Sequence, residues 1–335
     1  MPAPDLAPLE PGDRLEPSVA VVYADVLAAR RRIAPYLSPT PVLRNPALDE
    51  ALGCAAYLKC ESLQPIGAFK VRGGLNLLAS LPPDERQQGV VTASTGNHGQ
   101  SIAYAARQFG SRAVIYAPEG ANPLKVESMH RLGAEVVLAG VDFDASRVLA
   151  ERRARQDGMR FVSSGDEPLL IAGVATAYLE LFEAVPDLDV VLVPVGGGSG
   201  AAGACVARSG VSPGLKIIGV QAAAAPSLHD SWHRRQVVAY DSAPTFADGL
   251  ATRMPFAMPM GIMLDGLADF WLVSEDQMRD GIRLLARAAH LIAEGAGAAA
   301  TAAALAHRPE LEGHKVGLML SGGNLPLDLL RAIIG

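Results

Sequence analysis

The sequence predicts an α/β protein with open, mostly parallel sheets that are covered by helices. Short runs of β-branched and apolar residues alternate along the chain with alanine-rich stretches of ten or more residues. This alternation is typical of parallel sheets with helices on both faces. A length of 335 residues, 50% of them hydrophobic, is enough for a sizeable core in two domains or one large one.

The elements follow one another in a regular order. Residues 1–20 carry five prolines and four acidic side chains without an apolar segment, so we expect a flexible tail and no signal peptide. Periodicity and composition predict helices over residues 21–36, 101–109, 201–207 and 296–306. Strands are expected over residues 56–59, 89–92, 113–116, 135–138, 190–195, 216–220 and 315–320.

Composition argues against several classes of protein. A net charge of -6 and a pI of about 5.7 argue against a nucleic-acid surface. The longest apolar tract, residues 296–306, is too short to span a bilayer, so no membrane partner is expected. The three cysteines, Cys54, Cys60 and Cys205, are odd in number and lack metal-type spacing. They predict a reducing, cytoplasmic compartment and no metal site.

The segment Gly67-Ala68-Phe69-Lys70 places a lysine among small residues and beside an aromatic ring. A flat ligand can approach such a lysine closely, and its amine could form a Schiff base with a carbonyl group. An ordinary solvated lysine at the start of a helix is the alternative. Glycine-rich segments further along the chain favour the functional interpretation.

A strand over residues 190–195 runs into a glycine-rich turn followed by a small-residue helix. Inward-turned backbone N–H groups and the helix N-terminus would form a cradle for phosphate. Residues 198–203 also match the dinucleotide fingerprint, which leaves a nicotinamide-dependent dehydrogenase as an alternative. That fingerprint needs an acidic residue at the end of the next strand, where Gln221 stands instead. The turn consists of Gly196, Gly197, Gly198, Ser199 and Gly200.

Two further polar segments follow predicted strands. Ser94, Thr95, Asn97 and His98 are crowded around Gly96 and Gly99 at the start of a helix, a setting that suits a carboxylate ligand. A simple N-cap would explain only one of these polar residues. The segment 321–324, Ser-Gly-Gly-Asn, follows the last strand and by itself would be a common turn.

Taken in order, these segments resemble the fold-type-II pyridoxal-phosphate (PLP) enzymes, and within them the threonine/serine dehydratase and serine racemase group. The resemblance covers nearly the whole chain after about residue 35. It implies a tryptophan-synthase-β-like fold with two open, mostly parallel twisted sheets flanked by helices. A large cofactor-binding domain would contain residues 21–88 and 165–335, and a small domain residues 89–164. The similar segments are 40–42, 59–61 with Gln64, 67–73, 94–100, 166–168 with 172–173, 194–200, 247–249, 294–297 and 321–324.

The resemblance also implies roles for individual residues. Lys70 would be the Schiff-base lysine and the base at the substrate Cα, and Phe69 would lie against the cofactor ring. Asn97 would bind the ring hydroxyl, Gly196 to Gly200 the phosphate, and Ser321 the ring nitrogen. Ser94, Thr95, Asn97 and His98 would surround the substrate carboxylate. Thr95 stands where racemase relatives have a serine that donates a proton from the opposite face.

A neutral hydroxyl at the ring nitrogen stabilises a protonated ring poorly, which favours prompt expulsion of a β-substituent. The resemblance therefore implies elimination of water from a β-hydroxy amino acid, L-threonine or L-serine, to give a 2-oxo acid and ammonia. A 3-hydroxyaspartate ammonia-lyase and a serine racemase are the alternatives. Arg147 and Arg253 could meet a second substrate carboxylate. We expect a cytoplasmic homo-oligomer, a dimer, whose partner is a small amino acid.

Overall fold

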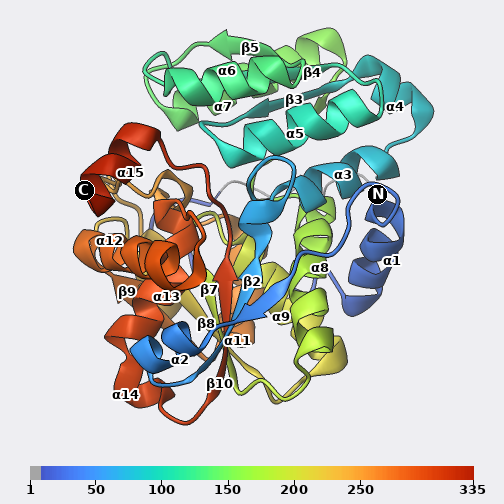
Figure 1. Ribbon diagram of the computed structural model, residues 1–335. Coiled ribbons are helices and arrows are strands. Elements are labelled where there is room, and N and C mark those ends of the chain that lie inside the picture. The colour runs from blue at the N-terminus through green and yellow to red at the C-terminus, as the bar shows by residue number, and fades with distance from the viewer. Residues whose placement is uncertain (1–8) are drawn as a thin grey trace.

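The computed structural model describes residues 9–335 and confirms the predicted α/β class with two sheets (Figure 1). The larger sheet has six strands in the order β1-β2-β10-β7-β8-β9. All neighbours in it are parallel except β1 and β2, which run antiparallel. Its strands are β1 (Val42–Arg44), β2 (Ala55–Cys60), β7 (Val190–Pro194), β8 (Lys216–Ala222), β9 (Asp269–Val273) and β10 (Lys315–Leu320).

The smaller sheet has four strands in the order β5-β4-β3-β6, and every pair is parallel. It forms the upper part of the molecule in Figure 1, with α5 and α7 beside it. All four strands come from one continuous stretch of chain, whereas the larger sheet combines strands from both sides of that stretch. The strands are β3 (Val90–Ala93), β4 (Ala113–Ala117), β5 (Glu135–Leu138) and β6 (Arg160–Phe161).

Helices fill most of the connections between strands. The helix expected over residues 21–36 is shorter, because the Asp25 carboxylate accepts the Val22 N–H at its start and Pro35 follows its last turn. The α-helices are α1 (Tyr23–Ile33), α2 (Pro46–Leu52), α3 (Val71–Ser80), α4 (Pro83–Gln88), α5 (Asn97–Gln108), α6 (Pro123–Arg131), α7 (Phe143–Asp157), α8 (Pro168–Ala184), α9 (Ser199–Val211), α10 (Ser227–Arg234), α11 (Ala257–Gly266), α12 (Glu275–Leu284), α13 (Gly295–Ala306), α14 (Arg308–Leu311) and α15 (Leu327–Ile334). Three short helices complete the set: η1 (Glu61–Leu63), η2 (Asp248–Leu250) and η3 (Leu285–Ala289).

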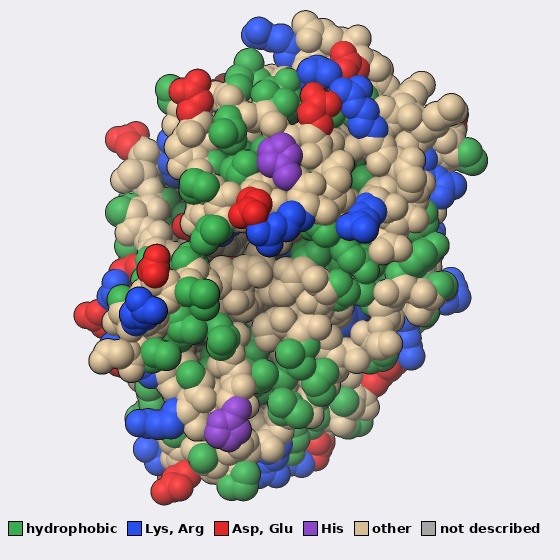
Figure 2. Space-filling model, turned by 45° about the horizontal axis from the view of Figure 1, so that its top comes forward, with side chains coloured by type: hydrophobic (Ala, Val, Ile, Leu, Met, Phe, Trp, Pro, Cys, Tyr) green, Lys and Arg blue, Asp and Glu red, His purple; other side chains and the backbone are tan. Residues whose placement is uncertain are grey.

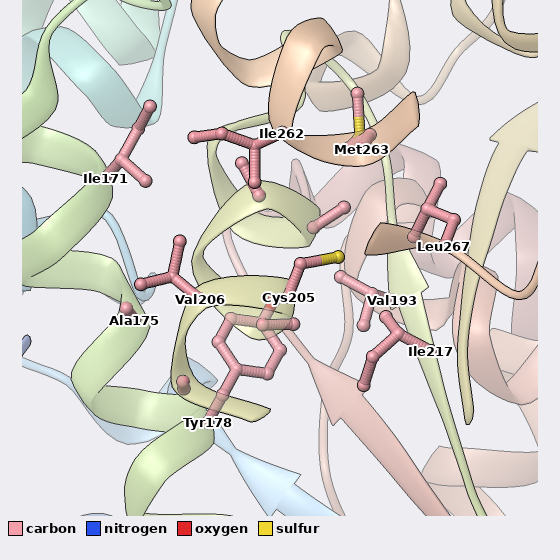
Figure 3. Close-up of a cluster of buried hydrophobic side chains, with 14 of the residues drawn as sticks. Ile171, Ala175, Tyr178, Val193, Cys205, Val206, Ile217, Ile262, Met263 and Leu267 are labelled. Carbon is pink, nitrogen blue, oxygen red and sulfur yellow. The ribbon is translucent and has the colours of Figure 1, made fainter. Parts of the chain in front are cut away.

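The large sheet is buried on both faces. Along β7, Val191 and Val193 point into one hydrophobic cluster, while Val190 and Leu192 point into another, as the two-residue period of a strand requires. The first cluster lies under α8, α9 and α11, where Tyr178 and Cys205 pack with the aliphatic side chains shown in Figure 3. The second lies under α13 and α12. The prediction of a buried alanine-rich helix near residue 296 is confirmed by α13.

Three strands were missed because they are short or lie at an edge of a sheet. β6 has two residues and β1 has three, too few for a periodic pattern, and β9 is the last strand of the large sheet. These three strands form because each pairs with a longer neighbouring strand.

The flexible tail expected over residues 1–20 falls partly outside the described residues, which begin at 9. From there the chain lies along the large domain, where the Leu15 N–H donates to the Arg235 carbonyl (3.1 Å) and the Leu15 side chain is buried. Among the helices of residues 9–335, none combines the length and the apolar character that crossing a membrane requires. The domain limits expected from the sequence stay a prediction.

Candidate active site

Four loops meet at the carboxyl ends of parallel strands, which is where open α/β sheets form their sites. They follow β2, β3, β7 and β10. The loop before α3 and the loop after β10 are joined directly, because the Phe69 N–H donates to the Ser321 carbonyl (3.0 Å) and the Gly323 N–H to the Gly67 carbonyl (2.9 Å). An isolated antiparallel bridge between Ala68 and Gly322 lies between these two bonds. The lysine and Ser321 therefore belong to one rigid ladder.

Lys70 is the residue immediately before α3, and its side chain reaches the start of α9. Its Nζ donates to Ser199 Oγ (2.7 Å) and lies 5.3 Å from the centre of the Phe69 ring. Desolvation by the surrounding protein lowers the pKa of the Lys70 amine to about 8. Its backbone carbonyl accepts the Ser101 hydroxyl (2.6 Å), which ties the lysine to α5. The site thus holds an amine that is readily deprotonated near neutral pH.

The glycine turn before α9 has no room for side chains. Gly198 has a φ of +89°, a left-handed conformation that favours glycine. A Cβ at Gly196 would lie 1.9 Å from the Gly249 carbonyl oxygen, and one at Gly197 would lie 3.1 Å from the Phe256 ring. The turn leads into Ser199, the first residue of α9, so backbone N–H groups and the positive end of the helix face the amine of Lys70. This arrangement suits a ligand that has both a carbonyl group and a phosphate.

Ser321 is 6% exposed, and its hydroxyl forms no hydrogen bond among residues 9–335. This hydroxyl is not one of the fully enclosed, unpaired polar atoms of these residues, so a small ligand can reach it. Since its backbone is fixed by Phe69, the hydroxyl is available to a polar atom of a ligand on the same side as Lys70.

Ser94 and His98 are both buried and bonded within the small domain. Ser94 Oγ accepts the N–H groups of Gly96 (3.1 Å) and Gly99 (2.8 Å) and so holds the loop before α5. His98 Nε2 lies 2.8 Å from the Thr92 hydroxyl, which itself donates to a backbone carbonyl, so the imidazole nitrogen is the donor. Burial, and secondly the charge of Lys70, lower the His98 pKa to about 3, which keeps the ring neutral.

Asn97, the first residue of α5, connects loops of the two sheets through its carboxamide. Its Nδ2 donates to Glu294 Oε1 (2.6 Å), and its Oδ1 accepts from Asn324 Nδ2 (2.8 Å). Thr95 lies half-buried in the loop just before it. The sequence placed Glu294 and Asn324 in motifs without giving either a role.

The two arginines expected near a second carboxylate are already paired. Arg253 donates to Asp144 and lies 3.2 Å from Asp142, which belong to the first turn and the cap of α7. Arg147 Nη1 lies 2.6 Å from Glu151 within α7. Whether either one meets a substrate stays a prediction.

An ion pair joins an element beside the small sheet to one beside the large sheet. Lys125 at the start of α6 donates to Asp248 of η2, and both line a cavity of about 180 Å³ together with Glu294 and Asn324. A Cβ at Gly96 would lie 3.6 Å from Lys125 Nζ, so the ammonium group lies over the loop before α5. Figure 2 shows acidic and basic side chains side by side next to a hollow in this face of the molecule.

A buried cluster of charges lies behind the lysine loop. Arg72 of α3 donates to both carboxylate oxygens of Glu61 (2.7 and 2.8 Å) and of Glu180 (2.7 Å each). Lys59 Nζ also binds Glu180 (2.5 Å). Burial raises the pKa of Glu61, but the opposing effects of Arg72, Lys59 and the Thr40 hydroxyl are larger together. The net pKa of Glu61 therefore lies below its usual value. The cluster fixes the first turn of α3 and therefore the backbone next to Lys70.

Together, the fold and these loops define an enzyme that binds a phosphorylated carbonyl cofactor beside a reactive lysine. The profile of the family described as "Pyridoxal-phosphate dependent enzyme" matches residues 33–322, and the chain belongs to this family. The resemblance stated from the motifs, the fold class and the cofactor are confirmed. The family match also decides against the nicotinamide alternative.

Several relatives cover most of the chain. An L-threonine ammonia-lyase of Thermotoga maritima is 37% identical over 94% of this chain and 78% of its own. An L-threo-3-hydroxyaspartate ammonia-lyase of Saccharomyces cerevisiae is 34% identical over 94% and 97%. A solved serine racemase from Dictyostelium discoideum aligns with a TM-score of 0.86 at 32% identity, covering 91% of this chain and 99% of that one.

The residues present fit PLP. The glycine turn presents backbone N–H groups and the start of α9 to an anion, and it packs so closely on η2 that a Cβ at Gly196 would lie 1.9 Å from the Gly249 carbonyl oxygen. The amine of Lys70 reaches the start of α9, and the backbone of Ser321 is bonded to Phe69 beside it. When bound, PLP supplies an electron sink that labilises the bonds at the substrate Cα. Within residues 9–335 no group of three His, Cys, Asp or Glu side chains is placed to hold a metal ion.

Proposed function

We propose that this chain is a PLP-dependent ammonia-lyase that eliminates water from L-threonine or L-serine and releases a 2-oxo acid and ammonia. The observation that carries the proposal is the meeting of Lys70, the glycine turn and a neutral Ser321 at the carboxyl ends of the strands. The name of the Thermotoga maritima relative supports the reaction class.

In the proposed site, Lys70 would hold the cofactor covalently through its amine and would accept the proton taken from the substrate Cα. Its lowered pKa, about 8, suits both tasks, since a base acts best when its pKa lies near the working pH. Phe69, whose ring centre lies 5.3 Å from Lys70 Nζ, would lie against the cofactor ring, and the N–H groups of residues 196–200 would bind the phosphate.

The loop before α5 is proposed to bind the substrate carboxylate. Thr95 and the N-terminal N–H groups of α5 would hold the carboxylate, and Asn97 would donate to the ring hydroxyl of the cofactor. Ser94 and His98 act on this loop through the bonds that hold it, because both side chains already have partners in the small domain. Their direct contact with substrate stays a prediction.

Ser321 distinguishes elimination from competing reactions. A hydroxyl carries no charge to hold a proton on the ring nitrogen, so negative charge at the substrate Cα is stabilised only briefly and departure of the β-hydroxyl is favoured. An acidic residue at position 321 would hold that proton and would favour a longer-lived negative charge at the substrate Cα. The neutral hydroxyl of Ser321 agrees with the elimination reaction.

L-threo-3-hydroxyaspartate is the second candidate substrate, because a relative named as an ammonia-lyase of this compound is 34% identical to the chain. A second substrate carboxylate would need a free cation. Arg147 and Arg253, the two arginines considered for it, are paired with carboxylates, so we rank threonine and serine first.

A panel assay tests the proposal. Purified holoenzyme is incubated with L-threonine, L-serine, L-threo-3-hydroxyaspartate and D-serine, and 2-oxo acid and ammonia are measured. We expect equal amounts of both products and the highest kcat/KM for threonine or serine. Racemisation is followed in parallel by deuterium uptake at Cα with chiral analysis. Exchange and inversion of serine without release of 2-oxo acid would make the chain a racemase and overturn the proposal.

We further propose that the protein is cytoplasmic and forms a homodimer. Three free cysteines, all buried, agree with a reducing compartment. The proposed domains contain residues 21–88 with 165–335, and residues 89–164. Sedimentation of the holoenzyme tests the oligomeric state. Limited proteolysis tests the domain limits, because cleavage is expected between the two proposed domains.

A further inference from the structure

The carboxamide of Asn97 is held by a chain of hydrogen bonds that begins at a backbone carbonyl. Asn324 Nδ2 donates to the Ile66 carbonyl oxygen (2.8 Å), which can only accept, so the orientation of the Asn324 amide is fixed. The other hydrogen of the same nitrogen is directed at Asn97 Oδ1 (2.8 Å). Asn324 lies so close to the lysine loop that a Cβ at Gly67 would be 2.6 Å from its Oδ1.

The orientation of Asn324 decides that of Asn97. Because Asn97 Oδ1 faces a donor, its Nδ2 must face the other way, where Glu294 Oε1 accepts it (2.6 Å). Glu294 is 9% exposed and is fixed by its own N–H, which donates to the Gly322 carbonyl (3.1 Å). One hydrogen of Asn97 Nδ2 is thereby used, and the second has no partner among residues 9–335.

This series of hydrogen bonds also joins the elements of the two sheets. Asn97 begins α5, which packs on the small sheet, whereas Ile66, Asn324 and Glu294 belong to loops of the large sheet. Burial raises the pKa of Glu294, with smaller opposing effects from Lys125 and Asn97. A carboxyl group in either protonation state offers an oxygen that accepts the Asn97 N–H.

We propose that Glu294 and Asn324 are positioning residues that orient the Asn97 carboxamide so that its free N–H donates to the ring hydroxyl of PLP. Neither residue reacts with the substrate. Glu294 contributes an acceptor and Asn324 a donor, and the Ile66 carbonyl sets the direction of both bonds. The inference rests on the role proposed for Asn97, which the experiment tests separately.

The experiment measures the absorbance spectrum of bound PLP and the PLP dissociation constant, neither of which requires turnover. Asn97→Ala reports whether Asn97 contacts the cofactor. Glu294→Met removes the acceptor while keeping the length of the side chain, Glu294→Gln restores an acceptor oxygen, and Asn324→Asp removes both donors. Asn45→Asp is the matched control, because Asn45 acts as an N-cap acceptor at α2 and aspartate caps equally well.

We expect Glu294→Met and Asn324→Asp to shift the cofactor absorbance in the same direction as Asn97→Ala and to weaken PLP binding about 3- to 10-fold, the effect of one lost hydrogen bond. Glu294→Gln and Asn45→Asp should resemble the wild type. Circular dichroism confirms folding, and Glu294→Met alone carries the test if Asn324→Asp does not fold.

Two results would overturn the inference while leaving the role of Asn97 intact. The first is a shifted spectrum for Asn97→Ala together with a wild-type spectrum and affinity for Glu294→Met. The second is Glu294→Gln behaving like Glu294→Met, which would mean that the charge of Glu294 acts rather than its acceptor oxygen. A wild-type spectrum for Asn97→Ala would overturn both the role of Asn97 and the positioning.

Discussion

The lowered pKa of Lys70 predicts how the apoenzyme captures PLP as the pH changes. Only the neutral amine attacks a carbonyl group. With a pKa of about 8, roughly one quarter of the Lys70 amines are neutral at about pH 7.5, against about one in a thousand for an amine at the model value of 10.5. The folded site should therefore present about 200 times more reactive amine than a solvated lysine does.

Stopped-flow mixing of apoenzyme with PLP measures this difference. The rate constant for covalent capture should rise about tenfold per pH unit at low pH and become constant above about pH 8. Nα-acetyllysine mixed with PLP is the control, and its rate constant should keep rising to about pH 10. Lys70→Ala apoenzyme should show no covalent phase.

A capture rate that follows the control up to about pH 10 would refute the assigned pKa, because the Lys70 amine would then behave as a solvated one. A covalent phase that persists in Lys70→Ala would show that another lysine reacts. In either case the desolvation argument for this site would be wrong.

Three further variants test other parts of the site. Ser321→Asp should hold a proton on the ring nitrogen, slow dehydration and add a long-wavelength absorbance band during turnover; unchanged elimination without that band contradicts the role of Ser321. Arg72→Met should lower the free energy of unfolding by about 3–5 kcal/mol in urea titrations, because the carboxylates of Glu61 and Glu180 both lose the guanidinium group that neutralises them in the buried cluster. The pKa of Glu61 is lowered in the folded wild type, so the stabilisation by its ionised form is present above the pKa of the unfolded chain and is lost as the pH falls through the pKa of the folded protein. The difference in unfolding free energy between the wild type and Arg72→Met should therefore become smaller in acid. A difference that does not change with pH contradicts this reasoning. Arg253→Ala should change kcat/KM for threonine and L-threo-3-hydroxyaspartate by the same few-fold factor, because Arg253 is paired with Asp144; a selective loss for the dicarboxylate of about 10- to 150-fold would show a substrate contact instead.

The fold class could be predicted from local patterns, and the cofactor from the resemblance that the ordered motifs carry. β7 is a continuous apolar run and β8 has an apolar centre, which is typical of strands buried on both faces. The short strands β1 and β6 could not be predicted, since two or three residues have no measurable period and form a strand only beside a longer neighbour.

The sequence by itself determined which chemical groups the site has, because strand–loop–helix order brings Lys70, the glycine turn and Ser321 to the same ends of the sheets. Only the tertiary structure decided where polar side chains point. It turned His98 toward Thr92, paired Arg253 with Asp144, and brought Glu294 and Asn324 to either side of Asn97. The physical reason is that a hydrogen bond depends on ångström distances between atoms far apart in the chain, and no local pattern of residues encodes those distances.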